Sequence, residues 1–407
     1  MSSWLKSAGR GLAVAALLAG GSAALAAENE APASFDVGRL PGIPPRGPNY
    51  TIANPVKSDG FLRIYLLQTP YGDFTVYGDA MVRMRIAELA AVYELDKVSN
   101  SEAFNKGLAD AGLAPIKFAG EMIVNPVQTI GNTMAGIGNF FGQINSGMAN
   151  AGKTQDDGMA SLLGVTKKKR ELAVQLGVDP YTDFQPLAVR LTKLSEAAAT
   201  GGLVVNGALM AIPGVGGAVV GYTSTSGGLH DMARDYTAAQ LLDFNRPKLL
   251  AMGADPALAE AFLLNRNFTP LDATAIVTAL DTMPDVQGRA LFIQRAASVT
   301  RRDAAYFTRR QAELLAAYQA KTGALAAFTV YGDFPFNQLR NGGVLGYWPL
   351  DAVSWTGNTS RSIRATTDAL KRSGHRGPAE IRITGQATNL SKQQLKALGW
   401  TLVENAR

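Results

Sequence analysis

The chain carries only two histidines, and one of them, His230, lies in its densest polar motif, GLHDMARDYT. Asp231 follows this histidine directly, and a serine-containing stretch, TSTSGG, precedes the motif with Ser224 and Ser226. A histidine beside a carboxylate can act as a general base, and a serine hydroxyl near such a base can act as a nucleophile. Ser224, Ser226, His230 and Asp231 are therefore the candidate catalytic residues of a hydrolase.

The same motif also fits an ordinary surface helix. On a helix, His230 and Arg234 lie one turn apart, as do Asp231 and Asp235, which is the spacing of i,i+4 charge pairs. The serines lack the GxSxG pattern that presents a nucleophile on a sharp turn. The residues favour the surface helix, and the hydrolase remains the alternative.

Basic residues gather in two places. One is the run KKKR, and the other is a pair of Arg-Arg dipeptides on one expected helix, with Tyr306 and Phe307 between them. Such clusters are typical of a solvated helix face, and they also occur where a protein binds an anionic surface. The candidate anion- or lipid-binding residues are Lys167, Lys168, Lys169, Arg170, Arg301, Arg302, Arg309 and Arg310.

A literal P-loop pattern, GMANAGKT, occupies residues 147–154. In a P-loop, Lys153 would neutralise phosphate and Thr154 would hold magnesium. The context argues against this, because FFGQINS before the pattern is not a buried strand and QDDGMAS after it starts a helix poorly. The stretch PGVGGAVVG has Val219 where a dinucleotide fingerprint needs its third small residue. We therefore expect no nucleotide, no cofactor and no histidine-rich metal site.

Residues 197–222, AAATGGLVVNGALMAIPGVGGAVVGY, form a long uncharged stretch. Its length would span a bilayer, but Pro213-Gly214 divides it into two halves that are each too short. Small residues allow two such halves to pack closely as a helical hairpin. The hairpin is either buried in the core of a helical domain, which we favour, or inserted into a membrane.

The first 26 residues have the pattern of a cleavable secretory signal. Lys6 and Arg10 precede an apolar run that ends in Ala24-Leu25-Ala26, a small-x-small cleavage site. The chain has no cysteine, so it needs no disulfide in an oxidising compartment. Its net charge of +6 falls by two after cleavage and is too small to indicate nucleic acid. We therefore expect a periplasmic protein. If segment 197–222 inserts into a membrane, this protein would also be membrane-associated.

The expected fold class is α+β. A Pro- and Gly-rich linker, a β-hairpin, a large helical domain and a small βαβαβ module follow the signal. Pairs such as Asp179-Pro180, Asp255-Pro256 and Thr269-Pro270 place a proline just inside a helix. The expected boundaries are 1–26 for the signal peptide, 27–60 for the linker, 61–79 for the hairpin, 80–322 for the helical domain and 323–407 for the module.

The hexapeptide FTVYGD occurs twice, ending at Asp79 and at Asp333. FTVY favours a strand, glycine permits a change of direction, and aspartate favours a helix N-cap. Both copies therefore predict a strand-to-helix corner with an aspartate cap. Taken together, the sequence predicts an exported, non-enzymatic binding or scaffolding protein of the cell envelope, with anionic lipid or another envelope component as its partner. The alternative is a periplasmic hydrolase.

Overall fold

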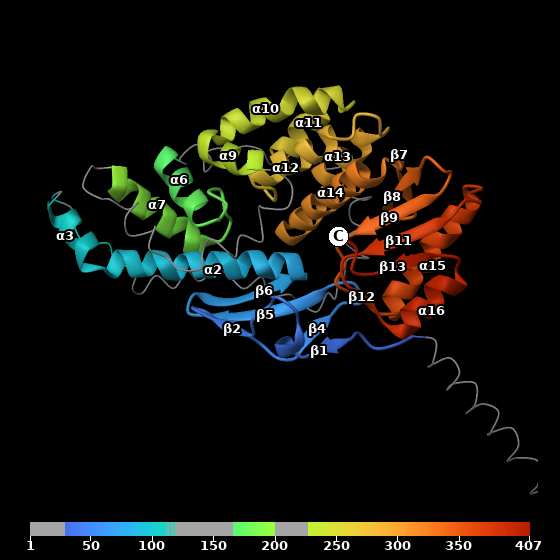
Figure 1. Cartoon of the computed structure of the whole chain (residues 1–407), viewed down its shortest axis with the longest axis horizontal. Coiled ribbons are helices and arrows are strands. Elements are labelled where there is room, and N and C mark those ends of the chain that lie inside the picture. The colour runs from blue at the N-terminus through green and yellow to red at the C-terminus, as the bar shows by residue number, and fades with distance from the viewer. Residues whose placement is uncertain are drawn as a thin grey trace, which may run out of the picture.

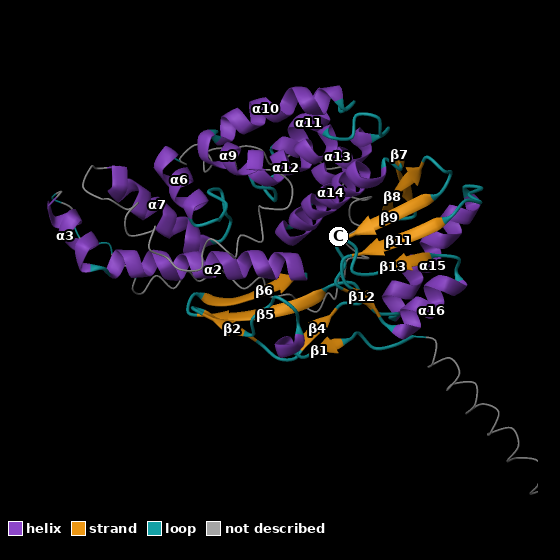
Figure 2. Cartoon of the chain, in the orientation of Figure 1, coloured by secondary structure: helices purple, strands orange, loops and turns teal. Residues whose placement is uncertain are grey.

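The computed structural model of the chain describes residues 29–110, 166–199 and 227–407, together with residues 112, 114, 116 and 118. The α+β class is confirmed, with an N-terminal sheet, a helical middle region and a C-terminal module (Figures 1 and 2). In Figure 1, the N-terminal sheet lies below the long helix α2, and α6 to α14 lie above α2. The second sheet, of the C-terminal module, lies on the right. The signal peptide, the P-loop pattern and nearly all of segment 197–222 lie outside the described residues.

The N-terminal sheet has six strands and includes the expected hairpin, β5 and β6, as an antiparallel pair. The expectation of an unpacked linker at 27–60 is wrong for residues 34–58, which supply four further strands. Tyr50 and Ile52 are buried with an exposed residue between them, so this segment does carry a strand pattern. Its strands are only two or three residues long, too short to stand out among prolines and glycines. The elements are β1 (Ser34–Phe35), η1 (Val37–Arg39), β2 (Arg46–Gly47), β3 (Tyr50–Ile52), β4 (Val56–Ser58), β5 (Arg63–Thr69) and β6 (Gly72–Tyr77).

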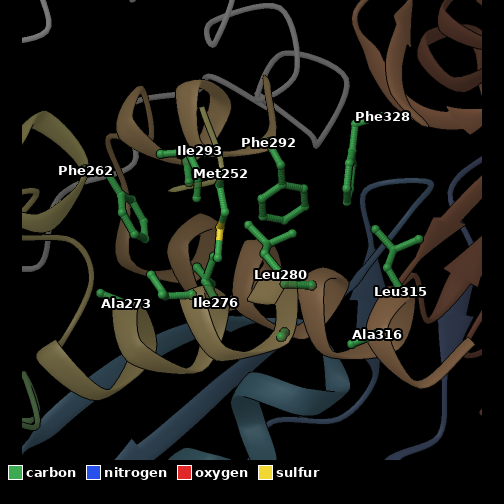
Figure 3. Packing of buried hydrophobic residues seen from close by; sticks show 14 of the residues in the cluster. Met252, Phe262, Ala273, Ile276, Leu280, Phe292, Ile293, Leu315, Ala316 and Phe328 are labelled. Carbon is green, nitrogen blue, oxygen red and sulfur yellow. The ribbon is translucent and has the colours of Figure 1, made fainter. Parts of the chain in front are cut away.

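The helical region surrounds a core of aliphatic and aromatic side chains contributed mainly by α10 to α14 (Figure 3). Asp255 and Thr269 cap α11 and α12 with proline in the first turn, as the sequence predicts. Asp179-Pro180 starts no helix, because α7 begins later, at Gln185. The helices are α2 (Asp79–Asn100), α3 (Glu102–Asp110), α6 (Lys167–Gln175), α7 (Gln185–Ala199), α9 (Gly227–Asp235), α10 (Ala238–Ala251), α11 (Pro256–Leu263), α12 (Pro270–Asp281), α13 (Arg289–Ala297) and α14 (Arg302–Thr322).

The C-terminal sheet has the strand order β13-β11-β9-β8-β7. Strands β9, β11 and β13 are parallel and are connected by α15 and α16, which form the expected βαβαβ module. Leu345 and Tyr347 of β9 belong to the core that includes α14, whereas Val344 and Trp348 belong to the core beneath α15 and α16. Both faces of this sheet are therefore covered. The elements are β7 (Leu325–Tyr331), β8 (Phe334–Leu339), β9 (Val344–Trp348), β10 (Ala352–Val353), α15 (Gly357–Arg372), β11 (Ala379–Ile383), β12 (Gln386–Ala387), α16 (Asn389–Ala397) and β13 (Thr401–Val403).

The two FTVYGD copies adopt different structures. The first ends β6 and leads into α2, as expected, but the N-cap is Gly78 with φ of 90°, and Asp79 is the first helical residue. The second copy is wrong as a helix corner, because Gly332 and Asp333 form the turn of the antiparallel β7–β8 hairpin. The six residues thus encode a strand followed by a turn, and the residues after them decide between helix and strand.

The N-terminal sheet meets the C-terminal module where the β4–β5 loop touches the loop before α15. The carbonyl of Phe61 accepts from the N–H groups of Asp351 and Ala352, at 3.3 and 3.2 Å, and that of Gly60 accepts from Ser354 at 2.9 Å. These bonds join two segments that are far apart in the sequence, and they satisfy main-chain groups at the junction. The two sheets are consequently held in a defined relation by main-chain bonds.

Gly60→Ala should lower the free energy of unfolding by about 2 kcal/mol or more, because the added Cβ meets both strain and a steric clash. Gly60 has φ of +98°, and a Cβ there would lie 2.6 Å from Thr359 Oγ1 and 3.1 Å from Thr356 Oγ1. Thr356 is the N-cap of α15, so the clash also disturbs this helix. The matched control is Gly357→Ala, where nothing lies within 4 Å and denaturant unfolding should show no loss. Equal midpoints for the two variants would contradict this account of the junction.

Candidate functional site

The predicted catalytic residues are only partly described. His230 is half-buried on α9, and Asp231 on the same helix has 61% of its side chain exposed and lies 3.2 Å from the guanidinium of Arg234. This is the surface ion pair of an ordinary helix. Ser224 and Ser226 lie outside the described residues, so the hydrolase stays an untested alternative.

The KKKR run opens α6, but its four cations do not form one surface. Lys169 donates to a threonine hydroxyl of α7 at 2.9 Å, and Arg170, 5% exposed, donates to a main-chain carbonyl of α9. Burial lowers the pKa of Lys169. Lys167 and Lys168 are exposed and lie beside Glu171. The expectation of a four-residue anion site is therefore wrong for the two residues that face inward.

The arginines of α14 also face inward, where we expected a lipid- or anion-binding surface. Arg309 is 1% exposed. Arg301, just before α14, binds Asp303 at 2.5 Å and lies over the ring of Tyr77. The remaining arginines join a continuous row of side chains of alternating charge, which we call the charge cluster. In order, its members are Glu88, Arg85, Asp183, Arg302, Asp272, Arg309, Glu313 and Arg310.

The first half of the charge cluster joins α2 to the loop before α7. Arg85 lies 2.7 Å from Glu88 and 2.6 Å from Asp183, and Asp183 in turn lies 3.2 Å from Arg302. The hydroxyl of Thr182 donates a further, short hydrogen bond to Glu88. Each of these charged groups therefore has a partner of opposite sign, supplied by a different turn or element.

The second half joins α12 to α14. Asp272, with 1% of its side chain exposed, binds Arg302 at 2.7 Å and Arg309 at 3.1 Å. Arg309 also binds Glu313 at 2.9 Å, and Glu313 binds Arg310. Four cations and four anions thus neutralise one another along the cluster. Removing one partner from such a buried set costs about 3–5 kcal/mol, because the opposite charge stays buried.

The electrostatic environment of the cluster differs from one carboxylate to the next. Burial raises the pKa of Asp183 and of Asp272, but the neighbouring arginines outweigh burial and leave both pKa values below the usual range. For Glu88, burial outweighs the attraction of Arg85, so its pKa is raised. Perturbed carboxylates can mark a catalytic site. Here burial accounts for the shift of Glu88, and the arginines of the cluster account for the shifts of Asp183 and Asp272.

Asp179 lies beside the charge cluster and is 4% exposed. Its carboxylate accepts from the N–H of Tyr181 at 2.8 Å and from the hydroxyl of Thr269 at 2.6 Å. Burial, and after it the charge of Asp272, raises the pKa of Asp179 to about 6. The fold therefore favours the neutral carboxyl. The stability that this group contributes is present below its ordinary pKa and is lost as pH rises towards 6.

A second group of ionisable residues lies where α2 begins. Asp351, 3% exposed in the loop after β9, accepts from the main-chain N–H of Asp79 at 2.9 Å and of Arg63 at 3.4 Å. The carboxylate of Asp79 binds the guanidinium of Arg63 at 2.7 Å and the hydroxyl of Tyr65 at 2.5 Å. Burial, and after it the charge of Asp79, raises the pKa of Asp351 well above its usual range. We call these four residues the junction site.

An apolar cavity of about 30 Å³ lies inside the C-terminal module. Aliphatic and aromatic side chains share its lining, and the aromatic ones are Phe334, Phe336, Trp348 and Trp400 of the module with Phe61 of the β4–β5 loop. A volume of about 10–15 Å³ admits one water molecule, so this cavity has room for about two. We therefore interpret the cavity as a packing void of the core, too small for a ligand of metabolite size.

Within the described residues, no group of three or more His, Asp or Glu side chains has the arrangement of a metal site. The described helices also include none that is long and apolar enough to cross a bilayer.

Sequence reasoning identified Asp79 but assigned it the wrong role, and it missed Asp351 and Arg63. The signal for Asp79 was local, the Gly-Asp pair at the end of a strand. Its partner lies in a distant loop, PLDAVSWT, that carries no motif. The sequence TPLD is typical of a capping box, and Thr269 and Asp272 form one. The ion pairs of Asp272 with Arg302 and Arg309 have no such local signal.

Asp179→Asn should stabilise the protein at pH 7.5 by up to about 3 kcal/mol, from a pKa raised to about 6 against about 3.9 when unfolded. Asparagine resembles the neutral carboxyl, and its amide can still meet Tyr181 and Thr269. The advantage should shrink to a few tenths of a kcal/mol near pH 4, where the wild-type group is protonated in both states. Denaturant unfolding at the two pH values measures this. The control is the exposed Asp285→Asn, and an advantage for Asp179→Asn that does not change with pH would contradict the prediction.

Asp351→Ala should cost about 1–3 kcal/mol, because the N–H of Asp79 at the start of α2 and the buried N–H of Arg63 at the start of β5 both lose their acceptor. Asp351→Asn keeps a carbonyl acceptor and removes the like charge beside Asp79, so its cost at pH 7 should be much smaller. Thermal unfolding of both variants tests this order. An asparagine variant as unstable as the alanine variant would show that the charge, and not the acceptor, is what α2 requires.

Comparison of the chain with protein-family models, with curated proteins and with solved structures gave no match in any of the three.

Proposed function

We propose that the mature chain is an exported, non-enzymatic binding or scaffolding protein of the cell envelope. The observation that supports this proposal most directly is that the fold makes its first described contacts just after the predicted cleavage site. Glu30, shortly after the predicted cleavage site at Ala26, is already bonded to Trp355 and Thr388 of the C-terminal module. Cleavage after Ala26 would therefore leave the first described contact of the fold in place. This supports a chain that is folded in its processed form.

A scaffolding role is supported by the way the ionisable side chains are used. The charge cluster and the junction site are largely buried, and each ties together segments that are far apart in the sequence. Reaction centres keep a charged group open to substrate. The described ionic groups contribute cohesion to the fold instead, which favours a binding or structural protein.

The proposed partner is anionic lipid or another component of the envelope. Lys167 and Lys168 are the members of the predicted basic clusters with the most exposed side chains, at 74% and 53%. They precede α7, whose end leads into the uncharged segment 197–222. Basic residues close to an uncharged segment are a combination that suits a membrane surface. Neither nucleic acid nor nucleotide is part of this proposal.

Expression of the full chain with cell fractionation tests the proposal. The exported protein should begin at Ala27 by amino-terminal sequencing, and it should be found in the periplasmic fraction or on membranes from which carbonate releases it. Flotation with anionic liposomes then separates lipid from other envelope partners. An intact Met1 on cytoplasmic protein would contradict export. Labelling by a fluorophosphonate that is lost in Ser224→Ala or Ser226→Ala would overturn the non-enzymatic assignment in favour of the hydrolase.

A further inference from the structure

The amino-terminal strap, residues 29–33, runs from β1 to the C-terminal module (Figure 1). Glu30 makes its contacts with the module. The N–H of Glu30 donates to the carbonyl of Trp355 at 2.9 Å. The N–H of Trp355 donates to Glu30 Oε1 at 2.5 Å, and the hydroxyl of Thr388 donates to the same oxygen. One residue of the strap thus presents both a main-chain donor and a carboxylate to the module.

The edge of the module that contacts Glu30 is formed by the N-termini of α15 and α16, which favour a carboxylate. Trp355 directly precedes Thr356, the N-cap of α15, and Thr388 is the N-cap of α16. Both helices start at the carboxyl ends of parallel strands, where helix N-termini favour negative charge and where ligands of such sheets bind. The single proton of Thr388 has two acceptors within reach, Ser391 Oγ at 3.0 Å and Glu30 Oε1, and the charged carboxylate is the stronger of the two.

A second feature of this edge is spare hydrogen-bonding capacity. The Oγ of Ser354 and the indole Nε1 of Trp355 are buried, and neither has a hydrogen-bond partner among the described residues. Ser354 is 1% exposed and Trp355 is 0% exposed. Buried polar groups are normally paired. Both groups belong to the same loop as the main-chain atoms of Trp355 that hold Glu30.

The rest of the strap is loosely placed. Ala31 and Pro32 are exposed, and proline has no N–H to donate. Strand pairing starts at Ser34, where β1 meets β4. Within the described strap, the hydrogen bonds to the module are those of Glu30, so release breaks these bonds and leaves the β1–β4 pairing in place.

We propose that Glu30 fills a carboxylate-binding position of the C-terminal module in cis, and that an extended acidic peptide binds this position when the strap leaves it. The peptide must offer a glutamate side chain and the N–H of the same residue, because Trp355 N–H, Thr388 hydroxyl and Trp355 carbonyl are the groups it meets. The strap then acts as a built-in competitor. This inference goes beyond the proposed function and does not depend on export.

The test uses the mature chain, residues 27–407, with Glu30→Ala and the peptide Ala-Glu-Asn-Glu-Ala-Pro, which copies residues 27–32. Fluorescence anisotropy of the labelled peptide should show binding to this variant that is at least tenfold tighter than to wild type. A tethered strap competes at a local concentration on the order of millimolar, which explains the difference. The control peptide, with Gln in place of its second Glu, should bind neither protein. Thr388→Ser in the Glu30→Ala background should keep binding, and Thr388→Val should remove it.

A second measurement keeps the test independent of the folding of these variants. In wild type, an excess of the same peptide should displace the strap and accelerate hydrogen–deuterium exchange at the N–H of Glu30, by at least threefold. Equal affinity for wild type and Glu30→Ala would show that the peptide binds elsewhere. Absence of binding to a folded Glu30→Ala variant, or an exchange rate at Glu30 that the peptide does not change, would overturn the proposal.

Discussion

The carboxylate of Asp351 holds the arrangement of the two sheets, because it is the acceptor at the start of α2. Gly78, the N-cap, has no side chain to offer, and Asp351 supplies the missing oxygen from the opposite end of the chain. Helix α2 extends from this point over the N-terminal sheet. The first N–H groups of a helix have no partner within the helix, so a buried helix start needs an acceptor from elsewhere. Without the C-terminal loop, α2 would begin in an unsatisfied state.

The charge cluster imposes the same kind of constraint further along α2. Arg85 and Glu88 lie in the second and third turns of α2, and they lead through Asp183 and Arg302 to α12 and α14. Buried charges are tolerated only when each has a close partner of opposite sign. The alternating order meets this condition along the whole cluster. It also removes Arg302 and Arg309 from any surface role, although their sequence pattern resembles a cationic patch.

The carboxyl edge of the C-terminal sheet is where these contacts converge. Asp351 reaches α2 from the loop after β9, the β4–β5 loop pairs with the same stretch, and Glu30 lies at the caps of α15 and α16. The contacts of Asp351 and of the β4–β5 loop lie within the junction between the two sheets. The contact of Glu30 is made by the strap, most of which is exposed. The edge that in other parallel sheets receives a ligand is here covered by the chain's own amino terminus. A binding role and a scaffolding role are therefore compatible in one module.

The sequence alone determined the elements whose signals are local. The α+β class, the β5–β6 hairpin, the capped starts of α11 and α12 and the βαβαβ module are all legible, because period, proline position and capping residues act over a few residues. Tertiary structure alone decided the roles of Asp79 and the α14 arginines, the strands hidden in residues 34–58, and the hairpin at the second FTVYGD. The residues around a charged side chain do not show which distant residue it will pair with. A strand of two or three residues is stabilised mainly by its neighbours in the sheet. Both are properties of contacts between segments far apart in the chain, and only the folded chain brings those segments together.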